Sequence, residues 1–106
     1  MTLIPDDRTW RVCLVVEVPF VIGRAAAIGR AARALEAFRG QVAGDGSRLT
    51  VALTVTAPDN LAAVAVAAEE VVATLARCGA PDAKVLDHLA DEYIELVGLD
   101  ALIEQL

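Results

Sequence analysis

The feature that most constrains the fold is a strict alternation of apolar and small polar residues over residues 48–56, "RLTVALTVT". Side chains of an extended chain alternate between two faces, whereas a helix would spread these apolar residues around its whole circumference. The apolar side holds Leu49, Val51, Leu53 and Val55. Because the other side is small and polar, the stretch predicts a strand in a sheet that packs on one face only, as antiparallel sheets commonly do.

A second alternating stretch, over residues 10–18, has one fully apolar side and one mixed side. The apolar side consists of Trp10, Val12, Leu14, Val16 and Val18. The mixed side consists of Arg11, Cys13, Val15 and Glu17. Pro19 has no N–H to donate to a neighbouring strand, so it is expected to end this one. Trp10 is expected to anchor the core, with contact to a partner as the alternative.

Two segments carry apolar residues at the three- and four-residue spacing of a helix. In residues 23–39 these are Ile28, Ala31, Ala32, Leu35 and Phe38. In the helix that Pro58, Asp59 and Asn60 would cap, they are Leu61, Val64, Ala68, Val71, Val72 and Leu75. Gly40 and Gly79 are expected to end the two helices, Gly40 in a left-handed conformation. Gly29 costs its helix about 1 kcal/mol relative to alanine, which a close approach to the sheet would explain.

Two further strands complete the expected sheet. The turn signal Gly44-Asp45-Gly46 predicts that a short strand over 41–43 pairs with the one beginning at Arg48. Residues 83–90 fit either a helix, which local pattern favours slightly, or a strand. We predict a strand, because a further paired strand leaves fewer backbone N–H and C=O groups of the sheet unpaired.

The resulting order, βαββαβ, predicts an α+β fold of the ferredoxin-like sandwich type with a C-terminal helical tail. The chain of 106 residues suits one domain. Residues 1–8 are expected to be a flexible lead-in, residues 9–90 the ferredoxin-like domain and residues 91–106 an acidic helical tail.

The net charge is −6 and unevenly spread: residues 1–50 hold seven arginines and five acids, residues 51–106 two bases and ten acids. Broad phosphate binding needs clustered cations, so nucleic acid is a disfavoured partner. The arginines of the first helix, which would serve an accessory of a DNA-binding regulator, are Arg24, Arg30, Arg33 and Arg39. The asymmetry indicates either a solvated acidic surface or pairing between copies of the chain.

The cysteines and the N-terminus indicate a cytoplasmic protein. Cys13 and Cys78 lack the spacing of a metal or redox motif and are expected to be reduced thiols. The first residues are acidic and interrupted by Pro5, unlike a secretory leader. No run of about 20 apolar residues is present, so no membrane span is expected.

A resemblance is carried by "TWRVCLVVEVPF", a following helix, the Gly-Asp-Gly turn, "LTVALTVTAPDNLAAV" and "ELVGLDALIEQL". Together these segments, which cover most of the chain, resemble a group of small actinobacterial or actinophage proteins. In that group a ferredoxin-like domain of unknown role usually precedes a helix-turn-helix. The sequence ends at Leu106, where that element would begin, so we expect it to be absent and carry over neither DNA binding nor any catalytic residue.

Few residues offer chemistry. His88 could act as a base oriented by Asp87 and Asp91, but no nucleophile has a sequence reason to lie near it. The carboxylates Asp87, Asp91, Glu92 and Glu95 lack the spacing of a calcium-binding loop. Arg24 could hold an anion at a helix N-terminus, without any phosphate-loop motif around it. We therefore predict no catalytic, cofactor-binding or metal-binding residues and no enzymatic activity.

The outward face of the sheet is the predicted functional site. It is small, weakly polar and rimmed by charge, which suits burial against a partner, although a merely solvated face is the alternative. Its residues are Arg11, Cys13, Val15, Glu17, Arg48, Thr50, Ala52, Thr54 and Thr56. The sequence predicts a non-enzymatic interaction or regulatory module that binds a protein partner or self-associates. A regulatory domain that senses a small ligand, of the amino-acid-binding type, is the alternative.

Overall fold

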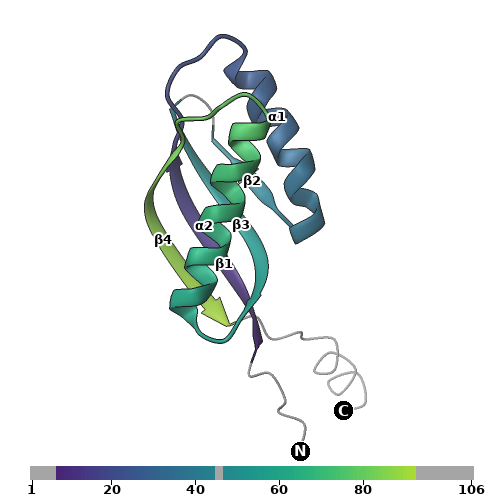
Figure 1. The fold of residues 1–106 in the computed structure, drawn as a ribbon, viewed down its shortest axis with the longest axis vertical. Coiled ribbons are helices and arrows are strands. Elements are labelled where there is room, and N and C mark those ends of the chain that lie inside the picture. The colour runs from purple at the N-terminus through teal and green to yellow at the C-terminus, as the bar shows by residue number, and fades with distance from the viewer. Residues whose placement is uncertain (1–6, 45–46, 93–106) are drawn as a thin grey trace, which may run out of the picture.

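The computed structural model describes residues 7–44 and 47–92, which form an α+β fold of one four-stranded antiparallel sheet and two helices (Figure 1). The elements are β1 (Arg8–Glu17), α1 (Arg24–Leu35), a 3-10 turn (Glu36–Phe38), β2 (Gln41–Ala43), β3 (Arg48–Ala57), α2 (Asn60–Arg77) and β4 (Lys84–Glu92). Across the sheet the strands lie in the order β2-β3-β1-β4. The α+β class predicted from the sequence is confirmed.

The two alternating stretches form the long central pair of the sheet. β1 and β3 pair along their whole length, from Arg8 opposite Ala57 to Glu17 opposite Arg48. The Val18 amide then donates to the Ser47 carbonyl at 2.7 Å, so pairing stops at Pro19. The predicted short strand is present as β2, which pairs antiparallel with β3.

The ambiguous segment is a strand, as predicted. β4 pairs with β1, with one irregularity between Val15 and Val16 that leaves Leu86 without a partner residue. The strand runs on to Glu92, so the expected start of a helix at Asp91 is wrong for these residues. Their pairing with Arg11 and Trp10 satisfies backbone groups that a helix would have withdrawn from the sheet. The remainder of the expected tail, and residues 1–6 of the lead-in, lie outside the described residues.

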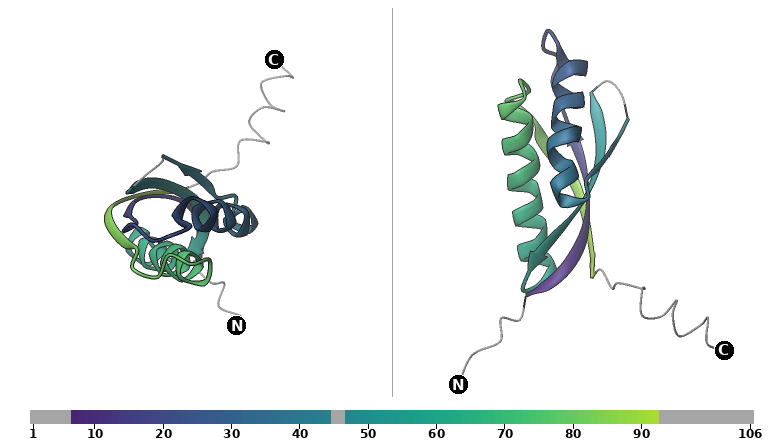
Figure 2. Two further views of the ribbon diagram at one scale, coloured as in Figure 1. Left: turned by 90° about the horizontal axis from the view of Figure 1, so that it is seen from above. Right: turned by 90° about the vertical axis from the view of Figure 1, so that its right-hand side faces the viewer.

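Both helices cover the same face of the sheet, as predicted, and the core lies between the two layers (Figure 2). α1 buries Ala27, Ala31 and Leu35. α2 buries Ala63, Ala67, Val71, Thr74 and Leu75. The stripe predicted for α2 is therefore partly wrong, since Leu61 is 76% exposed.

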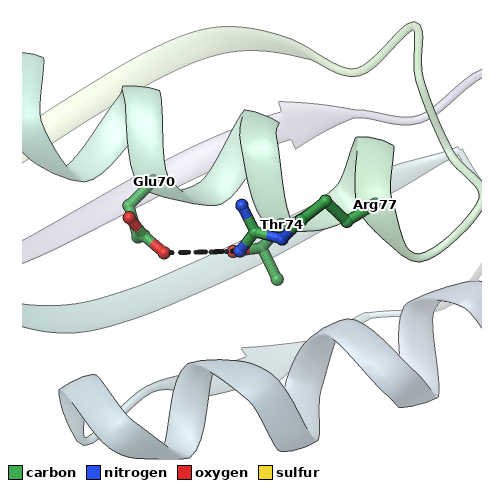
Figure 3. A network of polar contacts seen from close by, with 3 residues as sticks. All are labelled: Glu70, Thr74 and Arg77. Carbon is green, nitrogen blue, oxygen red and sulfur yellow. Dashed lines mark hydrogen bonds and ion pairs between the residues drawn. The ribbon is translucent and has the colours of Figure 1, made fainter.

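Thr74 is the one buried polar side chain among the described residues, and it is satisfied within its own helix. Its hydroxyl donates to Glu70 Oε1 at 3.3 Å and accepts from Arg77 Nη2 at 3.1 Å (Figure 3). Glu70 and Arg77 also form an ion pair at 3.7 Å. The Thr74 hydroxyl is therefore satisfied by side chains of α2 alone.

The structure contradicts both glycine predictions for the first helix. The left-handed residue after the 3-10 turn is Arg39, with φ 53°, whereas Gly40 does not have a positive φ. Gly40 is required by space instead, because a Cβ there would lie 2.5 Å from the Leu35 carbonyl oxygen. Gly29 is exposed and a Cβ there would meet nothing within 4 Å, so no close approach to the sheet explains it.

Two sequence predictions about single residues are confirmed. Trp10 packs against the core, and its indole N–H donates to the Ala57 carbonyl at 2.9 Å, which ties the start of β1 to the end of β3. Asp59 caps α2 by accepting a hydrogen bond from the Ala62 amide at 2.8 Å.

Candidate functional site

The face of the sheet opposite the helices carries the candidate site, and its layout follows from the strand register. Residues that are directly opposite in neighbouring strands share a face, and the face alternates along each strand. The open sheet face accordingly comprises Thr9, Arg11, Cys13, Val15 and Glu17 of β1, Arg48, Thr50, Ala52, Thr54 and Thr56 of β3, Gln41 and Ala43 of β2, and Lys84, Asp87, Leu89 and Asp91 of β4. No helix among the described residues covers this face (Figure 2).

All nine residues predicted from the sequence lie on the open sheet face. They occupy its two central columns, where each β1 residue lies beside a β3 residue: Arg11 beside Thr54, Cys13 beside Ala52, Val15 beside Thr50 and Glu17 beside Arg48. The middle of the face is therefore small and apolar, with threonines around it. Such a surface lets another layer approach closely, and Arg11 is the one charged residue of these two columns that lies away from the end of the strands.

The column of the open sheet face that β4 contributes was not predicted from the sequence. Leu89 lies beside Cys13 and is 61% exposed, which extends the apolar centre of the face toward the edge of the sheet. Asp91 lies beside Arg11, and Asp87 beside Val15. The alternation of "DHLAD" over 87–91 was the available signal, but the irregularity at Leu86 shifts the register and hides which side faces outward.

Charges on the open sheet face balance. Its bases are Arg11, Arg48 and Lys84, and its acids are Glu17, Asp87 and Asp91. The Arg11 guanidinium is held against the sheet, because Nη1 donates to Thr54 Oγ1 at 3.0 Å and to the Arg39 carbonyl at 2.7 Å. Apart from Arg11, which lies in a central column next to Cys13, the charges form a rim of both signs around the apolar centre.

The groups considered for catalysis are not brought together. His88 pairs with Leu14 and so lies on the helix side of β4, whereas Asp87 and Asp91 lie on the open side. The Asp87 carboxylate accepts from the His88 backbone amide at 2.8 Å. Within the described ranges no three His, Cys, Asp or Glu side chains are placed to hold a metal ion. Glu95 lies outside those ranges.

A shallow hollow of about 210 Å³ lies where the first turn of α2 meets β4. Its lining consists of Asn60, Leu61, Val64, His88, Leu89 and Ala90. The hollow is smaller than the roughly 300–1,000 Å³ of most small-molecule sites. Its size suits a single side chain or a very small ligand.

The arginines of the first helix are partly engaged within the chain. Arg24 lies over the Phe20 ring, 5.3 Å from its centroid, and Nη1 donates to the Val18 carbonyl at 3.5 Å. Arg30 Nη2 donates to the Cys78 carbonyl at 2.6 Å. These contacts join the helix to neighbouring loops and leave fewer cations available to bind phosphates.

Comparison with models of known protein families gives no match, and comparison with curated proteins gives none either. Among the described residues, no helix combines the length and the apolar character needed to cross a membrane.

Proposed function

We propose that this chain is a non-enzymatic protein-interaction or regulatory module that self-associates through the open sheet face. The observation that carries the proposal is a four-stranded layer that, within residues 7–44 and 47–92, has helices on one side only. Its other side has an apolar centre and charges of both signs that balance. A flat surface of this composition matches protein interfaces better than it matches an enzyme cleft.

We also propose the ferredoxin-like sandwich as the finer fold assignment and the cytoplasm as the compartment. The order βαββαβ with antiparallel neighbours in the order β2-β3-β1-β4 supports the first. The free thiols of Cys13 and Cys78 are consistent with the second. Kinship with the small actinobacterial or actinophage proteins is part of the same proposal and depends on the sequence segments alone.

The dimensions of the face set the expected strength of association. Strands of about ten residues span roughly 33 Å, and four strands span roughly 19 Å, which gives about 600 Å² per copy at most. Two copies would bury about 1,200 Å² in total, the lower end of the range for specific interfaces. We therefore expect a dimer that dissociates on dilution.

Size-exclusion chromatography with light scattering, at about 100 µM chain and below, tests the proposal. Val15→Glu and Thr54→Arg each place a charge near the centre of the open sheet face and should give monomers. Val66→Glu is the matched control, because Val66 is 45% exposed on α2 and lies on the helix side. A parent chain that is strictly monomeric and binds no partner, or association that survives Val15→Glu, would refute the proposal.

Ligand sensing is a second candidate function, and the hollow beside His88 and Asn60 favours it. It predicts that one of the free amino acids raises the melting temperature, by an amount equivalent to about 2.7 kcal/mol at a hundredfold excess over Kd. Val64→Trp should fill the hollow and abolish the shift. No shift with any amino acid at millimolar concentration would count against this candidate.

A further inference from the structure

We propose that two copies of this chain pair with their open sheet faces together, related by a two-fold axis that runs parallel to β1 and β3 and passes between them. The inference rests on the proposed function and specifies its partner and geometry. Homodimers are most often two-fold, and a two-fold axis within the interface brings the same face of both copies together. Maximal overlap of the two faces leaves two arrangements, with the axis along the strands or across them.

A column is the set of outward residues of one strand, and a row is the set of residues that lie directly opposite one another across the strands. With the axis along the strands, each column of one face lies over a different column of the other. β3 then faces β1 of the second copy, and β2 faces β4, with the rows kept in register. Arg48 lies opposite Glu17 of the second copy, and the reciprocal contact repeats the pair. In the middle rows, Ala52 lies opposite Cys13 and Thr50 opposite Val15. Small residues thus oppose apolar ones, and no like charges meet.

The outer column provides a second complementary pair. Gln41 lies directly opposite Ala52. Because β2 and β3 are antiparallel, Arg39, two residues before Gln41, lies at the row of Thr54. That row also contains Arg11 and Asp91. The contact of Arg11 with the Arg39 carbonyl places Arg39 beside this row independently. Asp91 of one copy therefore lies over the Arg39 position of the other. Neither side chain has an ion-pair partner among the described residues.

With the axis across the strands, each column lies over itself and the rows reverse about Ala52 and Cys13. Asp91 then faces Asp87 of the second copy, and this repulsive contact occurs twice. Arg48 faces Thr56 and Glu17 faces Thr9, so neither gains an opposite charge. Like charges that face each other across an interface select against that arrangement. The charges of the rim therefore favour the axis along the strands.

The net charge of the described residues and the twist of the sheet are both compatible with this pairing. Five of the fifteen acids lie outside the described residues, which leaves nine bases against ten acids, a net −1, in the described part. Repulsion between two such parts is small. Packed sheets rotate by about 30°, which displaces the end rows by several Å, and the length of an arginine side chain spans that displacement.

Charge exchange between two variants tests the geometry. Glu17→Arg alone, or Arg48→Glu alone, replaces both attractive contacts of the dimer by repulsive ones, and each variant should dimerise about tenfold more weakly than the parent. An equimolar mixture of the two restores opposite charges at both contacts and should return to within about threefold of the parental dissociation constant. Light scattering of each variant and of the mixture measures this directly.

Controls separate the contact within a chain from the contact between chains. Glu17 and Arg48 are also neighbours within one sheet, so urea unfolding of both variants must show that the monomers remain folded. The mixture cannot repair damage inside either chain, so its recovery is specific to pairing between copies. Parental dimerisation of the single variants, or a mixture that stays monomeric, would overturn the two-fold arrangement. The proposed function would still stand if Val15→Glu abolished association in the same assay.

Discussion

Gly40 and Gly29 offer a matched pair of substitutions for which the structure predicts opposite signs. An alanine Cβ at position 40 would lie 2.5 Å from the Leu35 carbonyl oxygen and 2.7 Å from the Leu35 Cβ, about 1 Å inside optimal contact. Neither neighbour is the end of a flexible side chain, and the Gly40 amide also donates to that carbonyl at 2.9 Å. Relief therefore requires backbone movement, and overpacking of this kind costs about 1–3 kcal/mol.

At Gly29 the same substitution meets open space at an exposed position of α1. Alanine there should stabilise the chain by about 0.5–1 kcal/mol, because it restricts the unfolded chain and suits the helix. Urea unfolding followed by circular dichroism should place the midpoint of Gly40→Ala below the parent and that of Gly29→Ala above it. With m values of about 1–3 kcal/mol/M the two midpoints should differ by roughly 0.5 M or more. Equal midpoints, or Gly40→Ala as the more stable variant, would show that Leu35 does not constrain this turn.

Three further substitutions test single contacts in the same unfolding assay. Asp59→Ala should lower the free energy of unfolding by about 1 kcal/mol, because it removes the α2 cap, and Asp59→Asn should retain most of that stability. Equal stability of the two variants would show that the cap does not stabilise the chain. Thr74→Val should change stability by less than about 1 kcal/mol, since Glu70 and Arg77 reach solvent once the hydroxyl is gone; a loss above 2 kcal/mol would show that the cluster is coupled to the core. Trp10→Phe should cost about 1 kcal/mol by leaving a strand-end carbonyl without its donor, and an unchanged midpoint would contradict this.

The sequence predicts the strands of this fold better than the packing of its helices. The period of two in β1 and β3 is unambiguous, because one side of each strand is fully apolar, while the other is mainly small and polar in β3 and mixed in β1. The residues that these two strands contribute to the open face could therefore be specified one by one. In α2 alanine occurs on almost every side, so several rotations of the helix yield an apolar stripe. The sheet selects the rotation that presents Ala63 and Ala67, whose small size allows close packing, and leaves the larger Leu61 outside.

Glycine and the last strand mark two further limits of sequence reasoning. A glycine after a helix is usually read as a left-handed cap, yet here Arg39 takes that conformation and Gly40 makes room for Leu35. The sequence alone cannot separate these two uses of glycine. In β4, pairing with β1 overrides a helical local pattern, and this depends on residues more than 60 positions earlier in the chain.

The edges of the sheet help to explain why association would use its face. β2 contributes only three residues, and β4, the long edge, carries an irregularity at Leu86 together with charges at Lys84, Asp87, Asp91 and Glu92. Charges and bulges of this kind oppose edge-to-edge pairing. The open face is better suited to association, since most of its charged groups lie at the rim and Leu89 extends the apolar centre. In the proposed self-association, charge on the edge and small residues on the face would direct a second copy onto the face, where the rim charges would select its orientation.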